Sequence, residues 1–247
     1  MSEARLLNTD EYVERATAEP RYSRAGAPRP PRKLGSHLEL FDCVTCDICV
    51  PVCPNDANFT LGTEQRQVEV VKVRPDDGGW SWRREEPLEL ERRHQIANFV
   101  DFCNDCGNCD VFCPEDGGPY VMKPRFFGHE DAWRQSRHLD GFHLRRGEAG
   151  DLMLGRFGGR EFRLEVAGGH AVFVGPNFKV EFDHDDPEGS FAGEASVEVD
   201  LTYCHIMDYL RRAIFDGEVG GYVARLATWR AETPPPHPQW PPPPERE

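Results

Sequence analysis

The amino-acid sequence predicts an α+β fold, with a cysteine-rich segment followed by a mainly β-sheet segment and a helix. Three observations support this class. Eight of the nine cysteines fall in two short runs, apolar and charged residues alternate through 139–200, and residues 201–217 have apolar side chains at helical spacing. At 247 residues and 38% hydrophobic residues, the chain can form one or two modest cores.

Residues 1–35 are expected to form an arm and a linker. Residues 1–19 fit a short acidic helix with Asn8 or Thr9 as its N-cap. Residues 20–33 hold five basic residues, four prolines and no acid, a composition typical of an extended linker. A solvated arm is the simpler interpretation, and docking onto an acidic partner is the alternative.

Residues 36–127 contain both cysteine runs and are expected to form one domain. Between the runs, residues 67–73 and 80–90 flank Asp-Asp-Gly-Gly at 76–79, which predicts a β-hairpin insertion. The apolar alternation changes phase between Val70 and Val71, which indicates a bulge. Residues 92–102 fit a helix that leads into the second run.

Residues 128–230 are expected to form a β-rich domain that ends in a helix. The segments LMLGRF, REFRLEV, HAVFVG and KVEFD alternate in polarity and are separated by glycine-containing turns, which predicts a β-meander. In the helix expected over 201–217, Cys204, Met207 and Ile214 share one face and Gly217 is a candidate C-cap. The proline-rich residues 231–247 are expected to be a disordered tail.

The two cysteine runs share the form C-x2-C-x2-C-x3-C-P, which is typical of bacterial ferredoxins with [4Fe–4S] clusters. Three closely spaced thiolates can wrap one face of a cubane. The proline then directs the chain away, and in two-cluster ferredoxins the fourth cysteine ligates the other cluster. The pattern therefore predicts two [4Fe–4S] clusters with crossed ligand sets. These are Cys43, Cys46, Cys49 and Cys113 for cluster I, and Cys103, Cys106, Cys109 and Cys53 for cluster II.

Zinc is the alternative occupant of these cysteines. Zinc sites usually pair two short Cys-x2–4-Cys knuckles, and a third cysteine followed by Cys-Pro is unusual for them. The cysteines thus favour a two-[4Fe–4S] ferredoxin-like domain with a hairpin insertion. The ninth cysteine, Cys204, is expected to be a small buried hydrophobic residue, and a ninth ligand or a redox sensor is the alternative.

The net charge of −14 argues against nucleic acid as a partner, because an acidic surface repels phosphate. No window approaches 18 uninterrupted apolar residues, so no membrane span is expected. The first thirty residues contain no apolar segment of the secretory type, and an odd cysteine count argues against a disulfide framework. We therefore expect a cytoplasmic protein.

Residues 46–59 (CDICVPVCPNDANF) and 102–127 (FCNDCGNCDVFCPEDGGPYVMKPRFF) resemble the C-terminal ferredoxin module of the putative selenate reductase family. Members of that family are large iron–sulfur flavoproteins associated with molybdenum hydroxylases of purine catabolism. More distantly, the segments are similar to dihydropyrimidine dehydrogenase and to the glutamate synthase small subunit. The family's large members carry flavin and nicotinamide modules, but this chain has no G-x-G-x-x-G motif.

The resemblance implies an electron-transfer subunit of a larger oxidoreductase, with no substrate site of its own. Its partners would be a flavoprotein, a molybdenum hydroxylase or both, and the chain would pass electrons between them. One alternative is a non-catalytic iron–sulfur protein whose clusters serve folding or redox sensing. A free-standing soluble ferredoxin is another, although it would not need the β-rich segment.

Overall fold

The structure is a computed structural model that describes residues 3–20, 33–62, 67–92, 94–184, 186–217 and 221–228. Residues 21–32 of the predicted linker (20–33) and the predicted tail at 231–247 lie outside the described residues. The helices are α1 (Glu3–Ala18), α2 (Asn108–Phe112), α3 (Pro119–Met122), α4 (Glu130–Gln135), α5 (Pro187–Ser190), α6 (Thr202–Phe215) and α7 (Gly221–Thr228).

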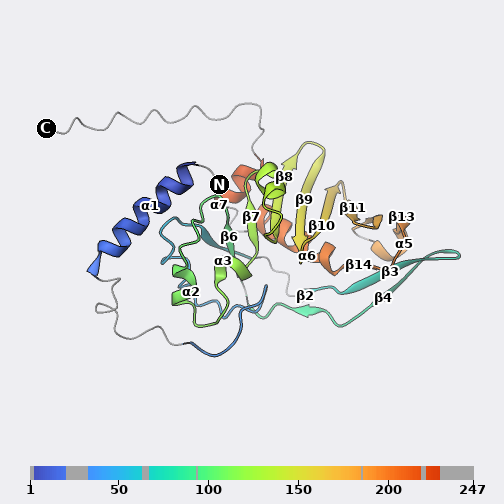
Figure 1. Cartoon of the computed structure of the whole chain (residues 1–247). Coiled ribbons are helices and arrows are strands. Elements are labelled where there is room, and N and C mark those ends of the chain that lie inside the picture. The colour runs from blue at the N-terminus through green and yellow to red at the C-terminus, as the bar shows by residue number, and fades with distance from the viewer. Residues whose placement is uncertain are drawn as a thin grey trace.

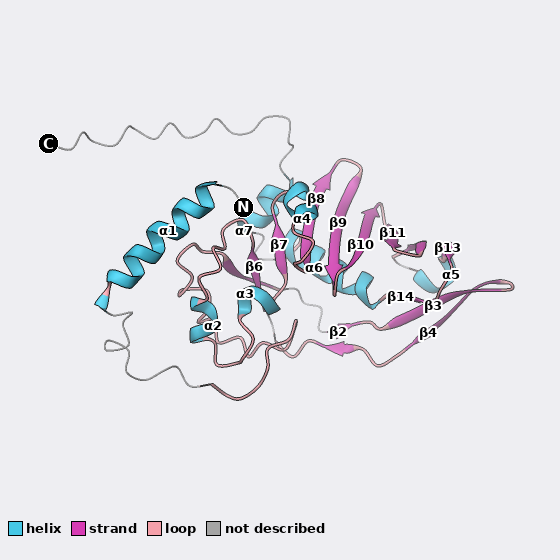
Figure 2. Ribbon diagram, in the orientation of Figure 1, coloured by secondary structure: helices cyan, strands magenta, loops and turns pink. Residues whose placement is uncertain are grey.

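A nine-stranded sheet forms the centre of the molecule (Figures 1 and 2). Its strands, in spatial order, are β1 (Asn58–Leu61), β6 (Gln95–Phe99), β7 (Arg125–Phe127), β8 (Gly141–Gly147), β9 (Gly150–Phe157), β10 (Arg160–Ala167), β11 (His170–Gly175), β12 (Phe178–Asp183) and β13 (Ala192–Ala195). β7 pairs in parallel with both β6 and β8, and the other neighbours are antiparallel. The meander expected from the alternating segments is confirmed as β8–β12.

The main core lies on the face of the sheet that α6 covers. Alternate strand residues such as Leu164 and Phe173 are completely buried there. Cys204 lies on the same helix and is also buried, so the expectation for this residue is confirmed. The helix predicted over 201–217 is present, but its C-cap is Asp216 rather than Gly217.

The opposite face of the sheet has a smaller core under α4. Successive residues of a strand point to opposite faces, so Met153 enters the main core and Leu154 enters the smaller one. Leu154 packs there with Trp133 of α4, whose ring lies 4.3 Å from the guanidinium of Arg156. Arg156 also donates hydrogen bonds to three backbone carbonyls, and these bonds compensate for the loss of water around its buried charge.

The predicted hairpin is confirmed as β3 (Val71–Asp76) and β4 (Gly79–Arg84). It projects from the sheet-rich body (Figure 1), and β3 also pairs with β14 (Val199–Asp200). The predicted bulge divides the hairpin into two pairs of strands. Before it, β2 (Gln67–Val68) pairs with β5 (Leu88–Glu89), and after it β3 pairs with β4.

Two local predictions were wrong. The segment 92–102 contains strand β6 rather than a helix, and all five strand residues are buried. Gln95 and Asn98 interrupt the apolar residues of this strand, so that Ile96, Phe99 and Val100 remain at the spacing of a helix face. The N-terminal helix is present as α1 but begins at Glu3, so Asn8 and Thr9 lie inside it instead of at its N-cap.

The sheet is continuous across the predicted domain boundary between residues 127 and 128. β7 ends at Phe127 and pairs with β8, and Phe126 packs against Phe142 with ring centroids 5.8 Å apart. The strands that carry the cysteine loops and the strands of the meander therefore share one sheet and one main core.

Candidate metal centre

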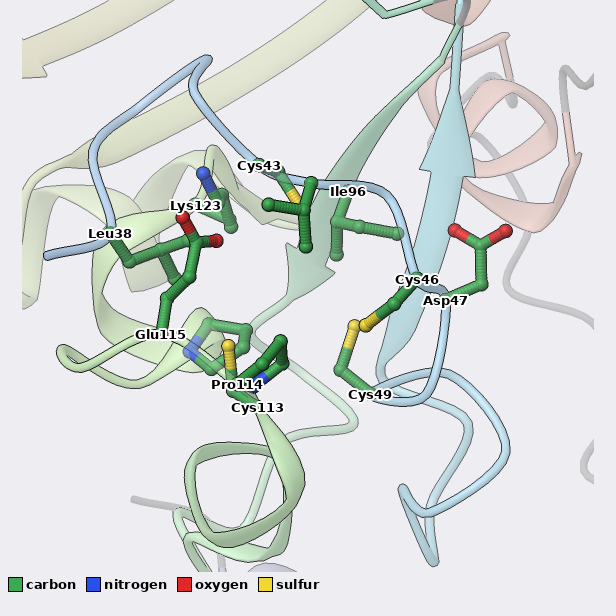
Figure 3. Close-up of a pocket in the computed structure, with 12 residues that line it drawn as sticks. Leu38, Cys43, Cys46, Asp47, Cys49, Ile96, Cys113, Pro114, Glu115 and Lys123 are labelled. Atoms are coloured by element: carbon green, nitrogen blue, oxygen red, sulfur yellow. The ribbon is translucent and has the colours of Figure 1, made fainter. Parts of the chain in front are cut away.

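Three cysteines of the first run and the last cysteine of the second run surround one pocket. Cys43, Cys46, Cys49 and Cys113 line it together with Leu38 and Ile96. Figure 3 shows the four sulfur-bearing side chains around this space, with Cys113 entering from the opposite side to Cys46 and Cys49. We call it pocket 1.

The remaining four cysteines surround a second pocket. It is lined by Cys103, Cys106 and Cys109 of the second run and by Cys53 of the first, and is here called pocket 2. The grouping in both pockets is the crossed one that the spacing predicts, with the fourth cysteine of each run placed beside the other run.

Strand β6 lies beneath both pockets. Ile96 lines pocket 1, and Asn98, two residues along on the same face of the strand, lines pocket 2. Asn58 of β1 is the register partner of Asn98 and accepts a hydrogen bond of 2.9 Å from its side-chain amide. The amide of Asn58 donates to the backbone oxygen of Cys49 at 2.9 Å, so it joins the second pocket to the first cysteine loop.

The two cysteine loops have the same backbone conformation at equivalent positions. Thr45 and Asp105, each two residues after the first cysteine of a run, have φ angles of 51° and 57°. Asp47 and Gly107, which each follow the second cysteine, have φ angles of 59° and 77°. Non-glycine residues rarely adopt this left-handed conformation, so its occurrence in both loops matches the sequence repeat with a structural one.

Backbone N–H groups near the cysteines donate hydrogen bonds to the sulfur atoms. The N–H of Thr45 donates to Sγ of Cys43 at 3.3 Å, and the N–H of Ala57 donates to Sγ of Cys53 at 3.2 Å. Hydrogen bonds to cysteine sulfur are one of the means by which a protein sets the reduction potential of an iron–sulfur cluster.

Charged side chains form part of the wall of pocket 1. Lys123 is almost completely buried and donates from Nζ to the backbone oxygen of Glu39 and, at 3.2 Å, to Asp42. Glu115 is 3% exposed, and its Oε2 has no hydrogen-bond partner within the described residues. Asp47 is held by His94 at 2.7 Å. Among these charged groups, the Glu115 carboxyl is thus the one whose burial is least compensated by hydrogen bonds.

The wall of pocket 2 is rich in amides instead. Asn58, Asn98, Asn104 and Asn108 line it together with Tyr120 of α3. Within the wall of this pocket there is no Asp, Glu, Lys or Arg among the described residues. The two pockets therefore differ in polarity although their cysteine loops are alike.

Burial controls the acidity of the thiols. Desolvation raises the pKa of Cys49 and of Cys103 to about 12. It also raises the pKa values of Cys43, Cys109 and Cys113, although hydrogen bonds to their sulfurs oppose the effect. Buried thiolates without a cation are therefore unfavourable here, whereas iron stabilises the thiolate form directly.

The donor set fits an iron–sulfur cluster better than a single ion. Among the described residues, no three His, Cys, Asp or Glu side chains are placed to hold one metal ion. A tetrahedral zinc needs its sulfurs about 2.3 Å from one point, whereas a cubane binds each thiolate at a separate iron. Each pocket is lined by four cysteines, the number that one cubane requires.

Sequence reasoning missed the non-cysteine residues of the walls. The cysteine spacing does not indicate that β6 places Ile96 and Asn98 beneath the two pockets. The sequence also predicts a helix for the segment that forms β6, and a helix would not place these residues there. The buried Lys123 was also missed, although it lies only ten residues after Cys113. The asparagines that flank both runs were the available signal for an amide-rich wall. Cys204 lines neither pocket.

Comparison with known proteins agrees with the geometry. Residues 39–116 match the family described as "4Fe-4S dicluster domain". Two curated proteins named "Putative oxidoreductase YgfK", from Escherichia coli K12 and O157:H7, are each 32% identical to the chain over 82 residues. The alignments cover 33% of this chain and 6% of each relative. No solved structure matches the chain significantly.

None of the described helices is long and apolar enough to cross a membrane. The chain contains an iron–sulfur domain of the 4Fe–4S type, and a similar segment occurs in an oxidoreductase relative.

Proposed function

We propose that this chain is an electron-transfer subunit of a larger oxidoreductase and holds two [4Fe–4S] clusters. The observation that carries the proposal is the gathering of the eight cysteines into two pockets of four, each with three members of one run and one of the other. In this arrangement Cys43, Cys46, Cys49 and Cys113 ligate cluster I, and Cys103, Cys106, Cys109 and Cys53 ligate cluster II.

The overall architecture belongs to the same proposal. We assign residues 36–127 to a two-cluster ferredoxin-like domain whose insertion is the β3–β4 hairpin, followed by the β-rich segment 128–230. The resemblance of residues 46–59 and 102–127 supports placing the chain beside the C-terminal ferredoxin module of the putative selenate reductase family, and the alignment with the YgfK proteins supports an oxidoreductase context. A flavoprotein, a molybdenum hydroxylase or both are the proposed partners.

The bound clusters would supply one-electron oxidation and reduction. The protein's own residues would fix their position: the left-handed bends at Thr45 and Asp105 shape the loops, and β6 closes the space behind them. Hydride transfer delivers two electrons together, whereas a cluster accepts one, so a flavin must stand between a nicotinamide and this chain.

The test is anaerobic analysis of the purified chain. We expect about eight irons and eight acid-labile sulfides per chain, and broad absorption near 400 nm that bleaches with dithionite but not with NADH or NADPH. Stoichiometric zinc without sulfide would refute cluster binding. Bleaching by NADPH without an added flavoprotein would refute the role as an electron-transfer subunit alone.

A further inference from the structure

Exposed apolar side chains gather on the segment that carries the cysteines. Large hydrophobic residues are exposed at twelve of the described positions, and six of these lie in or beside the two cysteine runs: Ile48, Phe102, Val111, Phe112, Val121 and Met122. Single exposed apolar residues are normal, but a concentration of them on one region marks an interaction surface.

Four of the six lie on two neighbouring short helices. Val111 and Phe112 of α2 are 53% and 42% exposed, and Val121 and Met122 of α3 are 44% and 37% exposed. The helices α2 and α3 pack together (Figure 1). We call these four residues the α2–α3 patch.

The same two helices form walls of both pockets. Cys109 lies within α2 and lines pocket 2, and Cys113, the residue after α2, lines pocket 1. On α3, Tyr120 lines pocket 2 and Pro119 lines pocket 1. A protein bound on the α2–α3 patch would therefore contact the helices that line both pockets. Electron tunnelling slows steeply with distance, so this is a favourable entry or exit point.

Acidic residues outnumber basic ones around the patch. Segments 42–61 and 100–122 contain no Lys, Arg or His, but eight acids: Asp42, Asp47, Asp56, Asp101, Asp105, Asp110, Glu115 and Asp116. Three of the eight have basic partners: Lys33 forms a 3.5 Å ion pair with Asp110, Lys123 forms one of 3.2 Å with Asp42, and His94 lies 2.7 Å from Asp47. Glu115 is buried. Asp101 and Asp105 are exposed. An acidic surface of this kind steers positively charged proteins toward it.

We propose that the α2–α3 patch is the docking surface for a redox protein whose contact region is apolar at its centre and bordered by Lys and Arg. The proposal rests on the function proposed above, because it gives the electron-transfer subunit its point of contact. Burial of the patch supplies affinity, and the acidic border supplies orientation and speed of association. A second copy of this chain is a poor occupant, since it brings two acidic borders together.

The test uses cytochrome c, a basic haem protein, as the probe. The full chain is reduced with dithionite and freed from excess reductant, then mixed anaerobically with ferricytochrome c in a stopped-flow instrument. Each electron lost by the reduced clusters converts one ferric haem to ferrous haem, which is followed at 550 nm. The second-order rate constant is measured from about 50 to 500 mM salt, because screening weakens steering over this range.

Three variants carry the same valine-to-serine substitution, two of them within the patch and one outside it as a control. Val111→Ser and Val121→Ser change the patch. Val197→Ser changes a residue that is 50% exposed between β13 and β14, far from α2 in Figure 1. We expect the patch variants to lower the rate constant at least threefold and the control to change it less than 1.5-fold. We also expect the wild-type rate constant to fall at least fivefold as salt rises.

Iron and sulfide analysis of every variant separates the two proposals. A wild-type chain without clusters refutes the proposed function. Loaded Val111→Ser and Val121→Ser chains that react as fast as Val197→Ser refute the docking surface alone. If one patch variant fails to load, the other decides the outcome. Sedimentation of a wild-type dimer that Val121→Ser dissociates would make the patch a self-association surface and overturn the inference.

Discussion

Replacing Cys53 with alanine is expected to remove the cluster from pocket 2, although Cys53 belongs to the first cysteine run. Cys53 lines pocket 2, whereas Cys49, only four residues earlier, lines pocket 1. Each pocket gathers four cysteines, which corresponds to one cluster of four irons. The variant should therefore hold about four irons and four sulfides per chain instead of about eight. Alanine is chosen because a serine alkoxide can replace a thiolate at iron.

Alkylation identifies which cluster has been lost. The variant is treated anaerobically with iodoacetamide, digested and analysed by mass spectrometry, and thiols bound to iron resist the reagent. We expect strong labelling of Cys103, Cys106 and Cys109 and protection of the other ligands. Cys113→Ala should give the reciprocal result, with labelling of Cys43, Cys46 and Cys49.

Cys204→Ala is the control for the loss of a thiol as such. Cys204 is 2% exposed on α6 and lines neither pocket, so this variant should keep about eight irons. The crossed assignment is refuted if Cys53→Ala exposes Cys43, Cys46 and Cys49 to alkylation while the second run stays protected. That result would mean that each run holds its own cluster.

Three further predictions concern stability. Tyr222→Phe should lower the free energy of unfolding by about 1 kcal/mol in urea titrations, because its hydroxyl donates a 2.9 Å hydrogen bond to the backbone oxygen of Asp56. Burial by itself would raise the pKa of Asp151, but hydrogen bonds from Arg146 and Arg211 outweigh it and lower the pKa. The resulting stability is present above the unfolded-state pKa of about 3.9 and is lost as pH falls below it, so urea titrations from about pH 6 to pH 2 should show a smaller decline for Asp151→Asn than for the wild type. Removing iron with a chelator should increase amide hydrogen exchange in both cysteine loops but leave β9–β11 protected, and uniform loss of protection would contradict this.

Local chemistry explains why part of the site was predictable. The spacing of the cysteines and the prolines after Cys53 and Cys113 is a local pattern, and the structure groups the cysteines as the spacing predicts. The hairpin and the meander were predictable for the same reason, since turn residues and alternation are read over a few residues. Two-cluster ligation itself stays a prediction.

Features set by long-range pairing were not predictable. The sequence predicts a helix in place of strand β6 because Ile96, Phe99 and Val100 have the i, i+3, i+4 spacing of a helix face. The same three residues are equally compatible with a strand that is buried on both faces. The true neighbours of β6, which are β1 and β7, are far away along the chain. Without that pairing, neither the amide wall built on Asn58 and Asn98 nor the continuity of the sheet past residue 127 is visible in the sequence.

The parallel pairing of β7 with β8 limits how this protein can be divided. A fragment that stops at residue 127 would lose β8 and turn β7 into an open sheet edge. It would also uncover Phe126 and Phe127, which are 0% and 3% exposed in the whole chain. Open apolar edges recruit strands from other molecules, so such a fragment would aggregate. Transplanting the cysteine loops into another protein therefore requires the meander to be moved with them.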